Sequence, residues 1–205
     1  MVHYLIEFRF HGYAKKYAKH LIHEVARKFK VKGVTRNRAV PHITLFGPFT
    51  TRQVGKVVSE LIEVGREFSL VPFIVKGFNY FDNKQKVIYL DIDPSAELKD
   101  LRRNLAQKLS KISDSQPWDD KKQFQFHSTV AFRDIDRKFS GIWKYIKDKE
   151  EPNIKQHLLR ITILKGKKIL YEYDLILGKL LNRKQALSRY WFNKTIKNYK
   201  DCLAS

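Results

Sequence analysis

Two short segments of the sequence carry the residue types that acid–base chemistry on a phosphodiester requires. They are His42-Ile43-Thr44-Leu45 and His127-Ser128-Thr129-Val130. In a β-strand, residues i and i+2 project from the same face, so each histidine shares a face with a threonine. An imidazole titrates near pH ~6.5, so at neutral pH one ring can accept a proton while another donates one. The threonine hydroxyls could bind nonbridging phosphate oxygens and stabilise charge that grows in the transition state.

These two segments occupy equivalent places in an internal repeat. The order strand, helix, short strand occurs twice along the chain. Tyr4 opens the first copy and Tyr89 opens the second, and the spacing from Tyr4 to His42 equals the spacing from Tyr89 to His127. Two similar lobes that face each other would bring His42 and His127 to a shared cleft.

The elements that would position these residues follow from the apolar periodicity. Apolar runs and alternation predict strands, whereas apolar residues spaced three or four apart predict amphipathic helices. No linker rich in glycine or serine divides the chain, so we expect one domain built of two lobes. Strands are predicted at 2–10, 43–49, 70–80, 86–93, 124–132, 154–164 and 169–177, and helices at 13–29, 54–68, 96–112 and 139–146.

The composition restricts the class of protein. The 205 residues include 41 lysines and arginines against 21 aspartates and glutamates, which gives a formal net charge of +20. Such a charge attracts polyanions, with RNA or DNA ahead of acidic membranes. No run is long and apolar enough for a membrane helix, and because a strand-like segment opens the sequence we expect no signal peptide. With Cys202 as its single cysteine, the chain has neither an internal disulfide nor a cysteine-based zinc site, and we expect a cytoplasmic protein.

The C-terminal part of the chain, 178–205, forms a distinct basic segment. Its apolar residues fall on one side of a helix, so we expect a basic amphipathic helix appended to the core. Two roles remain open, namely docking on its own domain and contacting RNA through cations and an aromatic ring. The positive residues are Lys179, Arg183, Lys184, Arg189, Lys194, Lys197 and Lys200, against Asp201 alone.

The paired His-x-Thr-x motifs resemble those of the 2H phosphoesterase superfamily. The most similar branch is the RNA 2′,3′-cyclic phosphodiesterase group, long labelled 2′-5′ RNA ligases. The resemblance covers residues 1–177 and leaves 178–205 as a C-terminal helical extension. It implies a bilobed, pseudo-duplicated α+β fold, with two antiparallel sheets around a central cleft and helices outside. It also implies hydrolysis of a 2′,3′-cyclic phosphate at an RNA end to a 2′-phosphate, with no metal and no cofactor.

The resemblance also implies a role for each motif residue. His42 would donate a proton to the leaving 3′ oxygen, and His127 would be the base that activates water. Thr44 and Thr129 would hold the phosphate. The residue pattern by itself indicates a pair of histidines and not which of them is the acid.

Two departures from the family pattern supply further candidates. Phe46-Gly47-Pro48-Phe49 follows the first motif, where bacterial members commonly continue Phe-Leu-Gly. Phe46 and Phe49 are candidates for stacking on a nucleobase, with core packing as the alternative. After the second motif an arginine often follows closely in the family, and here it is Arg133, which strand alternation places on the face of His127. Arg133 is a candidate phosphate contact, with a salt bridge to Asp134 or Asp136 as the alternative.

The expected partner is RNA that carries a 2′,3′-cyclic phosphate end, with tRNA fragments among the candidates. We expect a monomer that does not bind membranes. Two other functions remain open at this stage. One is the reverse reaction, which joins the cyclic phosphate to a 5′-hydroxyl as a 2′-5′ linkage. The other is a non-catalytic module that binds RNA ends, although binding alone would need no acid–base pair.

Overall fold

Two antiparallel sheets form the framework of the computed structural model, which describes residues 2–37, 39–82, 85–119 and 124–204. One sheet has five strands in the order β2-β1-β7-β8-β9, and the other has four in the order β5-β4-β3-β6. The five strands are β1 (Tyr4–Arg9), β2 (His42–Phe49), β7 (Arg160–Lys165), β8 (Lys168–Asp174) and β9 (Lys179–Asn182). The four strands are β3 (Val71–Phe81), β4 (Val87–Pro94), β5 (His127–Phe132) and β6 (Asn153–Leu158).

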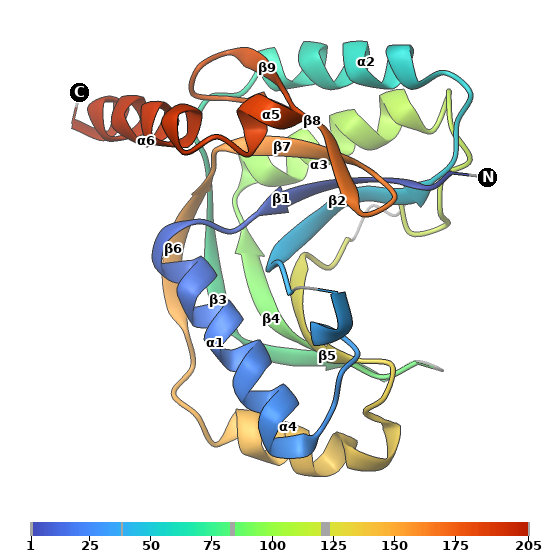
Figure 1. The fold of residues 1–205 in the computed structure, drawn as a ribbon, viewed down its shortest axis with the longest axis vertical. Helices are drawn as coiled ribbons and strands as arrows, with labels where there is room; N and C mark the ends of the chain where they lie inside the picture. The colour runs from blue at the N-terminus through green and yellow to red at the C-terminus, as the bar shows by residue number, and fades with distance from the viewer. Residues whose placement is uncertain (1, 38, 83–84, 120–123, 205) are drawn as a thin grey trace.

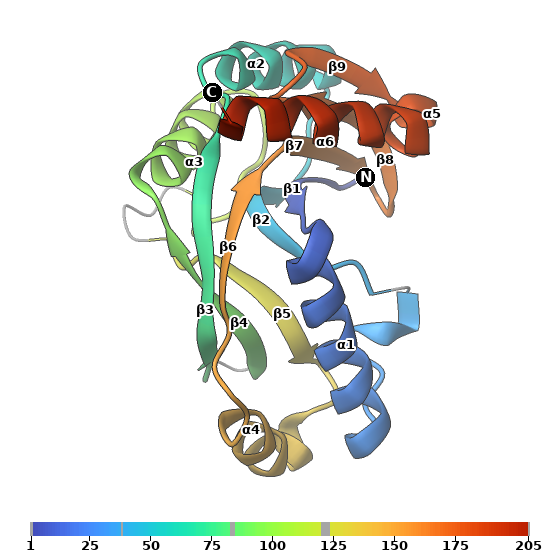
Figure 2. The ribbon, with the colours of Figure 1, turned by 90° about the vertical axis from the view of Figure 1, so that its left-hand side faces the viewer.

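The helices exchange between the two sheets. Helix α1 follows β1 in the chain but contacts β5 of the other sheet, and α3 follows β4 and contacts β2 of the other sheet as well as β3 and β4 of its own. Figures 1 and 2 show α2 and α3 together at one end of the molecule and α1 beside the four-stranded sheet. This exchange ties the two halves together. The α-helices are α1 (Gly12–Phe29), α2 (Val54–Arg66), α3 (Ala96–Leu109), α4 (Phe139–Lys147), α5 (Arg183–Ala186) and α6 (Arg189–Ala204).

The two sheets meet at their edge strands. Strand β2 is the edge of the five-stranded sheet, β5 is the edge of the four-stranded sheet, and the two strands contact each other. Both strands begin at the histidine of a His-x-Thr-x motif. The expected α+β fold, with two antiparallel sheets and a strand–helix–strand unit that occurs twice, is therefore confirmed. Along the described residues, none of the helices is long and apolar enough to cross a membrane.

One predicted strand is wrong. The sequence predicts a single strand over 154–164, but the chain leaves one sheet at Leu158 and enters the other at Arg160. Strand β6 pairs with β3, whereas β7 pairs with β1 and β8. The residue between them, Leu159, is buried. The apolar residues of 154–164 indicate only that the segment is buried. They do not reveal that the chain passes from one sheet to the other, because it stays extended where it does so.

The basic C-terminal segment is not wholly a helix. It opens with β9, which pairs with β8 as the fifth strand of its sheet, and the short α5 precedes the long α6. Thr195 of α6 is fully buried and reaches the sheet through hydrogen bonds to Arg160 and Asp174. The segment therefore docks on the domain, while its lysines remain on the surface.

Candidate active site

The four motif residues occupy matched positions on β2 and β5. In both strands the histidine and the threonine are half-buried, and the residue after each of them is buried. The buried partners Ile43 and Leu45 belong to the core, so the opposite face of β2 carries His42 and Thr44. Because β2 and β5 adjoin, the two motifs lie at one seam between the sheets.

The two imidazoles are held in the same way. Nδ1 of His42 lies 2.7 Å from the backbone oxygen of Val40, and Nδ1 of His127 lies 3.0 Å from that of Gln125. A carbonyl oxygen only accepts a hydrogen bond, so each Nδ1 must carry the proton that it donates. In the neutral form, each ring then has its lone pair on Nε2. The backbone two residues before each histidine thus fixes the tautomer that proton transfer through Nε2 requires.

His127 lies in an aromatic environment. Its ring is 5.0 Å from Phe81 in an edge-on arrangement and 5.1 Å from Tyr89. Burial lowers the pKa of His127, and the proximity of His42 lowers it further, against the opposing hydrogen bond to Gln125 and the charge of Asp91. Burial also raises the pKa of Tyr89 to about 12, so its hydroxyl is protonated at neutral pH. His127 is therefore neutral at pH 7 and available to accept a proton.

His42 lies in a charged environment instead. Nε2 of His42 is 3.7 Å from Oε2 of Glu7, and Glu7 accepts a hydrogen bond of 2.6 Å from Nε of Arg9. Glu7 is only 2% exposed. When His42 carries a proton on Nε2, Glu7 is placed to form an ion pair with it.

Comparisons with known proteins show which family the chain belongs to. A family model described as the 2′-5′ RNA ligase superfamily matches residues 16–167. A protein of Bacillus pumilus (strain SAFR-032) named "Putative phosphoesterase" is 30% identical over 147 residues, which cover 68% of this chain and 80% of that protein. The chain belongs to the 2′-5′ RNA ligase superfamily. Membership of this superfamily of 2H phosphoesterases supports a phosphoesterase-type activity.

Two solved structures are also similar to this member of the superfamily. A structure titled "Crystal structure of phosphoesterase" has a TM-score of 0.48 at 11% identity and covers 88% of this chain and 93% of its own. The structure of Kluyveromyces marxianus Usb1 has a TM-score of 0.45 at 9% identity and covers 82% of this chain and 95% of its own.

The cross-strand partners of the two motifs show which residues of the two repeated units are equivalent. His42 and Thr44 lie opposite Arg9 and Glu7, whereas His127 and Thr129 lie opposite Asp91 and Tyr89. Arg9 and Asp91 are therefore the structurally equivalent residues of β1 and β4, because each lies opposite the motif histidine. Fewer residues separate Arg9 from Asp91 than separate His42 from His127, so one constant offset in sequence does not relate the two units. The expected equivalence of Tyr4 and Tyr89 is therefore wrong, because Tyr4 pairs with Phe49 at the far end of β2.

The structure places the two candidate stacking residues in the core. Phe46 is 0% exposed and Phe49 is 1% exposed, and their ring centroids lie 5.2 Å apart. The ring of Tyr4 stacks on Phe49 at 5.7 Å. A ring enclosed in this way has no free face for a nucleobase, so the expected stacking role is wrong and the packing alternative holds.

The predicted position of Arg133 on the face of His127 is wrong as well. Strand β5 ends at Phe132, and its register with β4 is irregular between Thr129 and Ala131, so alternation is lost there. Arg133 has a φ of 73°, and its guanidinium lies 4.9 Å from the centroid of the Phe132 ring. The neighbouring Asp134 accepts hydrogen bonds from two backbone amides of the segment that follows α1.

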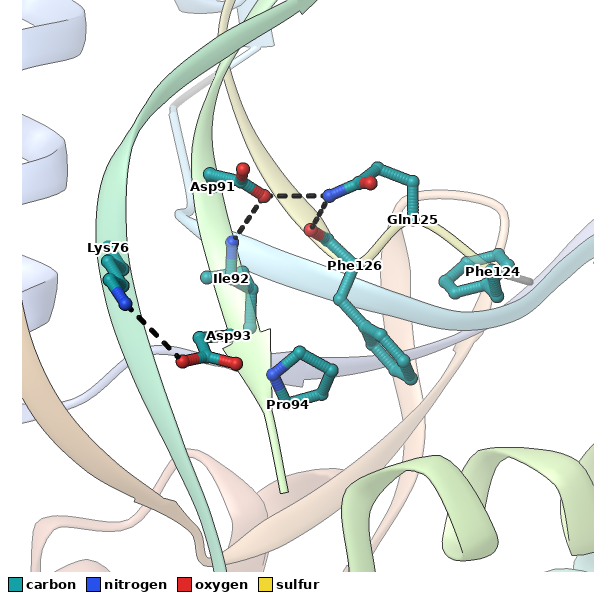
Figure 3. A pocket seen from close by; sticks show the side chains of 8 residues that line it. All are labelled: Lys76, Asp91, Ile92, Asp93, Pro94, Phe124, Gln125 and Phe126. Atoms are coloured by element: carbon teal, nitrogen blue, oxygen red, sulfur yellow. Dashed lines mark hydrogen bonds and ion pairs between the residues drawn. The ribbon is translucent and has the colours of Figure 1, made fainter. Parts of the chain in front are cut away.

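A hollow beside β4 carries carboxylates (Figure 3). Asp91 accepts a hydrogen bond of 2.7 Å from Nε2 of Gln125, and Asp93 lies 3.9 Å from Nζ of Lys76. The two carboxylates outnumber the single lysine, so the hollow would repel the negative charge of a phosphate. Within the described part of the chain, no group of three or more histidine, cysteine, aspartate or glutamate side chains is arranged to hold a metal ion.

Sequence reasoning missed the residues that surround the two histidines. Glu7 and Arg9 act on His42, and Phe81, Tyr89 and Asp91 surround His127. Alternation in the first strand places Glu7 with Leu5 on the face opposite to Tyr4, Ile6 and Phe8, and so gives no signal that Glu7 is buried. The cross-strand register that brings Glu7 to Thr44 and His42 follows only from the folded sheet.

Proposed function

We propose that this member of the 2′-5′ RNA ligase superfamily hydrolyses the 2′,3′-cyclic phosphate at the end of an RNA to a 2′-phosphate. The observation that carries the proposal is the matched pair of imidazoles on adjoining edge strands. Each ring donates through Nδ1 to a backbone carbonyl and has Nε2 available, and each is accompanied by a threonine on the same face. Acid–base cleavage of a cyclic phosphodiester needs such a pair.

The reaction requires two proton transfers. Nε2 of His127 takes a proton from water while the water oxygen bonds to phosphorus. The bond from phosphorus to the 3′ oxygen breaks, and His42 gives its Nε2 proton to that oxygen. The product carries a 2′-phosphate and a free 3′-hydroxyl. The hydroxyls of Thr44 and Thr129 donate to the nonbridging oxygens, where negative charge grows in the transition state.

The surroundings of the two histidines support this polarity. Burial against Phe81 and Tyr89 favours neutral His127, which suits the base. Oε2 of Glu7 lies 3.7 Å from Nε2 of His42 and is placed to pair with that ring when it holds the proton of the acid. The environment thus supports the assignment that the family resemblance implies.

The charge of the chain favours RNA as the substrate. A net charge of +20 attracts a polyanion more strongly than a free nucleotide, because each phosphate that lysine or arginine neutralises releases counterions.

Turnover of a short RNA with a 2′,3′-cyclic phosphate end tests the proposal. In the presence of EDTA, we expect the product to gain one water, and ³¹P NMR should report a 2′-phosphate. His42→Ala and His127→Ala should each lower kcat by about 10²–10⁴. His23→Ala is the matched control, because His23 is exposed on α1 and should leave kcat unchanged.

Three outcomes would contradict the proposal. The cyclic phosphate could persist with folded wild-type protein, or either motif variant could retain full kcat. The product could instead be a 2′-5′ linkage to an added 5′-hydroxyl oligonucleotide without hydrolysis, which would identify the reverse reaction.

A further inference from the structure

A second cavity lies on the face of the five-stranded sheet that carries His42. It measures about 380 Å³, within the range of small-ligand sites. Its walls are the end of β1, the first turns of α1, the strands β7 and β8, and the segment that joins α5 to α6. The family model ends at residue 167, so the α5–α6 wall belongs to the part of the chain outside it.

Strand β1 links this cavity to the candidate active site. Arg9 lines the cavity and is the cross-strand partner of His42. Thr162, which also lines it, is the cross-strand partner of Glu7 on the other side of β1. The lining comes from β1, β7 and β8 and includes no residue of β2. Neighbouring strands are about 4.8 Å apart, so the wall on β1 lies about one strand spacing from β2 and His42. A chain whose end lies at His42 can therefore continue into it.

The charge of the cavity suits a phosphodiester backbone. Its lining includes Arg9, Lys15, Arg160 and Arg189, with Glu172 as the acidic residue. Arg160 pairs with Glu172 and Asp174 in the floor, and Arg9 pairs with Glu7. Lys15 and Arg189 are exposed and line the cavity from two different elements, α1 and α6. The acidic hollow beside Asp91 offers no comparable charge.

The wall from the C-terminal segment adds an apolar surface. The Phe192 side chain is 37% exposed, and its ring centroid lies 5.6 Å from the guanidinium carbon of Arg160. Leu187, at the other side of the same wall, is 60% exposed. An exposed aromatic ring beside cations is the combination that binds single-stranded nucleic acid, because bases stack on the ring while cations contact the backbone.

The wall is held in place by buried polar contacts. Thr195 of α6 accepts a hydrogen bond from Nη2 of Arg160 and donates one to Asp174. Asn182 and Gln185 form a capping box at the start of α5. The cavity is therefore a formed site and not a gap under a loose tail.

We propose that this cavity binds the RNA chain on the 5′ side of the cyclic-phosphate nucleotide. The inference rests on the proposed function for the position of that terminal nucleotide. A 2′,3′-cyclic phosphate ends the chain at its 3′ side, so the remaining nucleotides lead away from His42 in the 5′ direction only. Lys15 and Arg189 contact their phosphates, and Phe192 stacks on a base.

The test compares a long and a short substrate. The charge-reversed double variant Lys15→Glu/Arg189→Glu is assayed on a hexanucleotide with a 2′,3′-cyclic phosphate end and on cytidine 2′,3′-cyclic phosphate. We expect kcat/KM for the hexanucleotide to fall about tenfold or more, chiefly through KM, with the mononucleotide unchanged. Lys197→Glu/Lys200→Glu is the matched control, because both lysines are exposed on α6 outside the cavity.

A binding measurement makes the inference independent of turnover. Fluorescence anisotropy with a labelled hexanucleotide that already ends in a 2′-phosphate should show the same loss of affinity, and Phe192→Ala should weaken it as well. Thermal unfolding of each variant verifies that it is folded.

The possible failures are distinguishable. If wild-type protein does not open the cyclic phosphate but the cavity variants still weaken hexanucleotide binding, the proposed function fails and the RNA site stands. Equal losses on both substrates, or an equal loss in the Lys197/Lys200 control, would overturn the RNA site. Unchanged hexanucleotide affinity in the cavity variants would also overturn it.

Discussion

His42 and His127 share a motif and a backbone contact, but their surroundings differ. Glu7 and Arg9 border His42, whereas the rings of Phe81 and Tyr89 border His127. A duplicated unit with identical surroundings would give two groups with the same proton affinity. Burial lowers the pKa of His127 and so prepares it as the base, while Glu7 is placed beside Nε2 of His42. Acid–base catalysis in one step needs two histidines with different roles.

Truncation of Phe81 should move the pH profile. The base must be neutral, so kcat/KM falls on the acid side as His127 becomes protonated. Burial lowers the pKa of His127, which places this acid limb below the usual value of about 6.5. Phe81→Ala admits water to the ring, so the pKa rises and the acid limb moves to higher pH. The variant should therefore lose more activity at pH ~5.5 than at pH ~8, as kcat/KM profiles would measure.

Tyr80→Ala is the control for this experiment. Tyr80 is the preceding residue on β3, and its ring packs on Phe139 and Trp143 rather than on His127. Its truncation should leave the acid limb in place. An acid limb that moves equally in both variants, or one that moves to lower pH in Phe81→Ala, would count against burial as the cause.

For single residues, the sequence predicts the position correctly when strand alternation alone decides it. His42, Thr44, His127 and Thr129 lie where alternation puts them. Alternation fails for Arg133, which lies beyond an irregular register and the end of the strand. Phe46 and Phe49 stay ambiguous in sequence because a phenylalanine suits both a core and a stacking surface.

At the scale of elements, most helices and strands follow from periodicity, but their partners do not. The apolar face of α1 predicts a buried side without indicating that it packs on the opposite sheet. The chain crosses between sheets at Leu159 within an apparently single apolar run. Strand β9 is hard to recognise because Lys179–Asn182 lies at the start of a segment whose composition favours a helix. Such choices depend on contacts between elements far apart in sequence.

The docking of the C-terminal segment changes how its role can be tested. Deleting 178–205 would remove β9 and would also leave Arg160 and Asp174 without Thr195. A buried polar group that loses its partner costs about 1–3 kcal/mol, so a deletion would affect stability together with any RNA contact. Point variants on the exposed side of the segment avoid this problem.

Thr195→Val should destabilise the protein by about 1–3 kcal/mol, because valine keeps the volume of threonine but lacks the hydroxyl that Arg160 and Asp174 share. Urea unfolding measures the change in the free energy of unfolding. Thr195→Ser is the matched variant, since it keeps the hydroxyl and loses one methyl group, worth about 0.8 kcal/mol. A serine variant at least as destabilised as the valine variant would show that packing, and not the polar network, holds α6.

At the scale of the whole molecule, the net charge of +20 predicts how salt acts on each substrate. Binding of single-stranded RNA releases about 0.7 counterions per neutralised phosphate. If the active site and the adjoining cavity together neutralise about three phosphates, raising salt from ~50 to ~200 mM should raise KM for the hexanucleotide roughly 20-fold. Cytidine 2′,3′-cyclic phosphate carries a single phosphate and no condensed counterions, so its KM should change far less over the same range. Parallel salt dependence for the two substrates would mean that the positive surface does not contact the RNA beyond its terminal nucleotide.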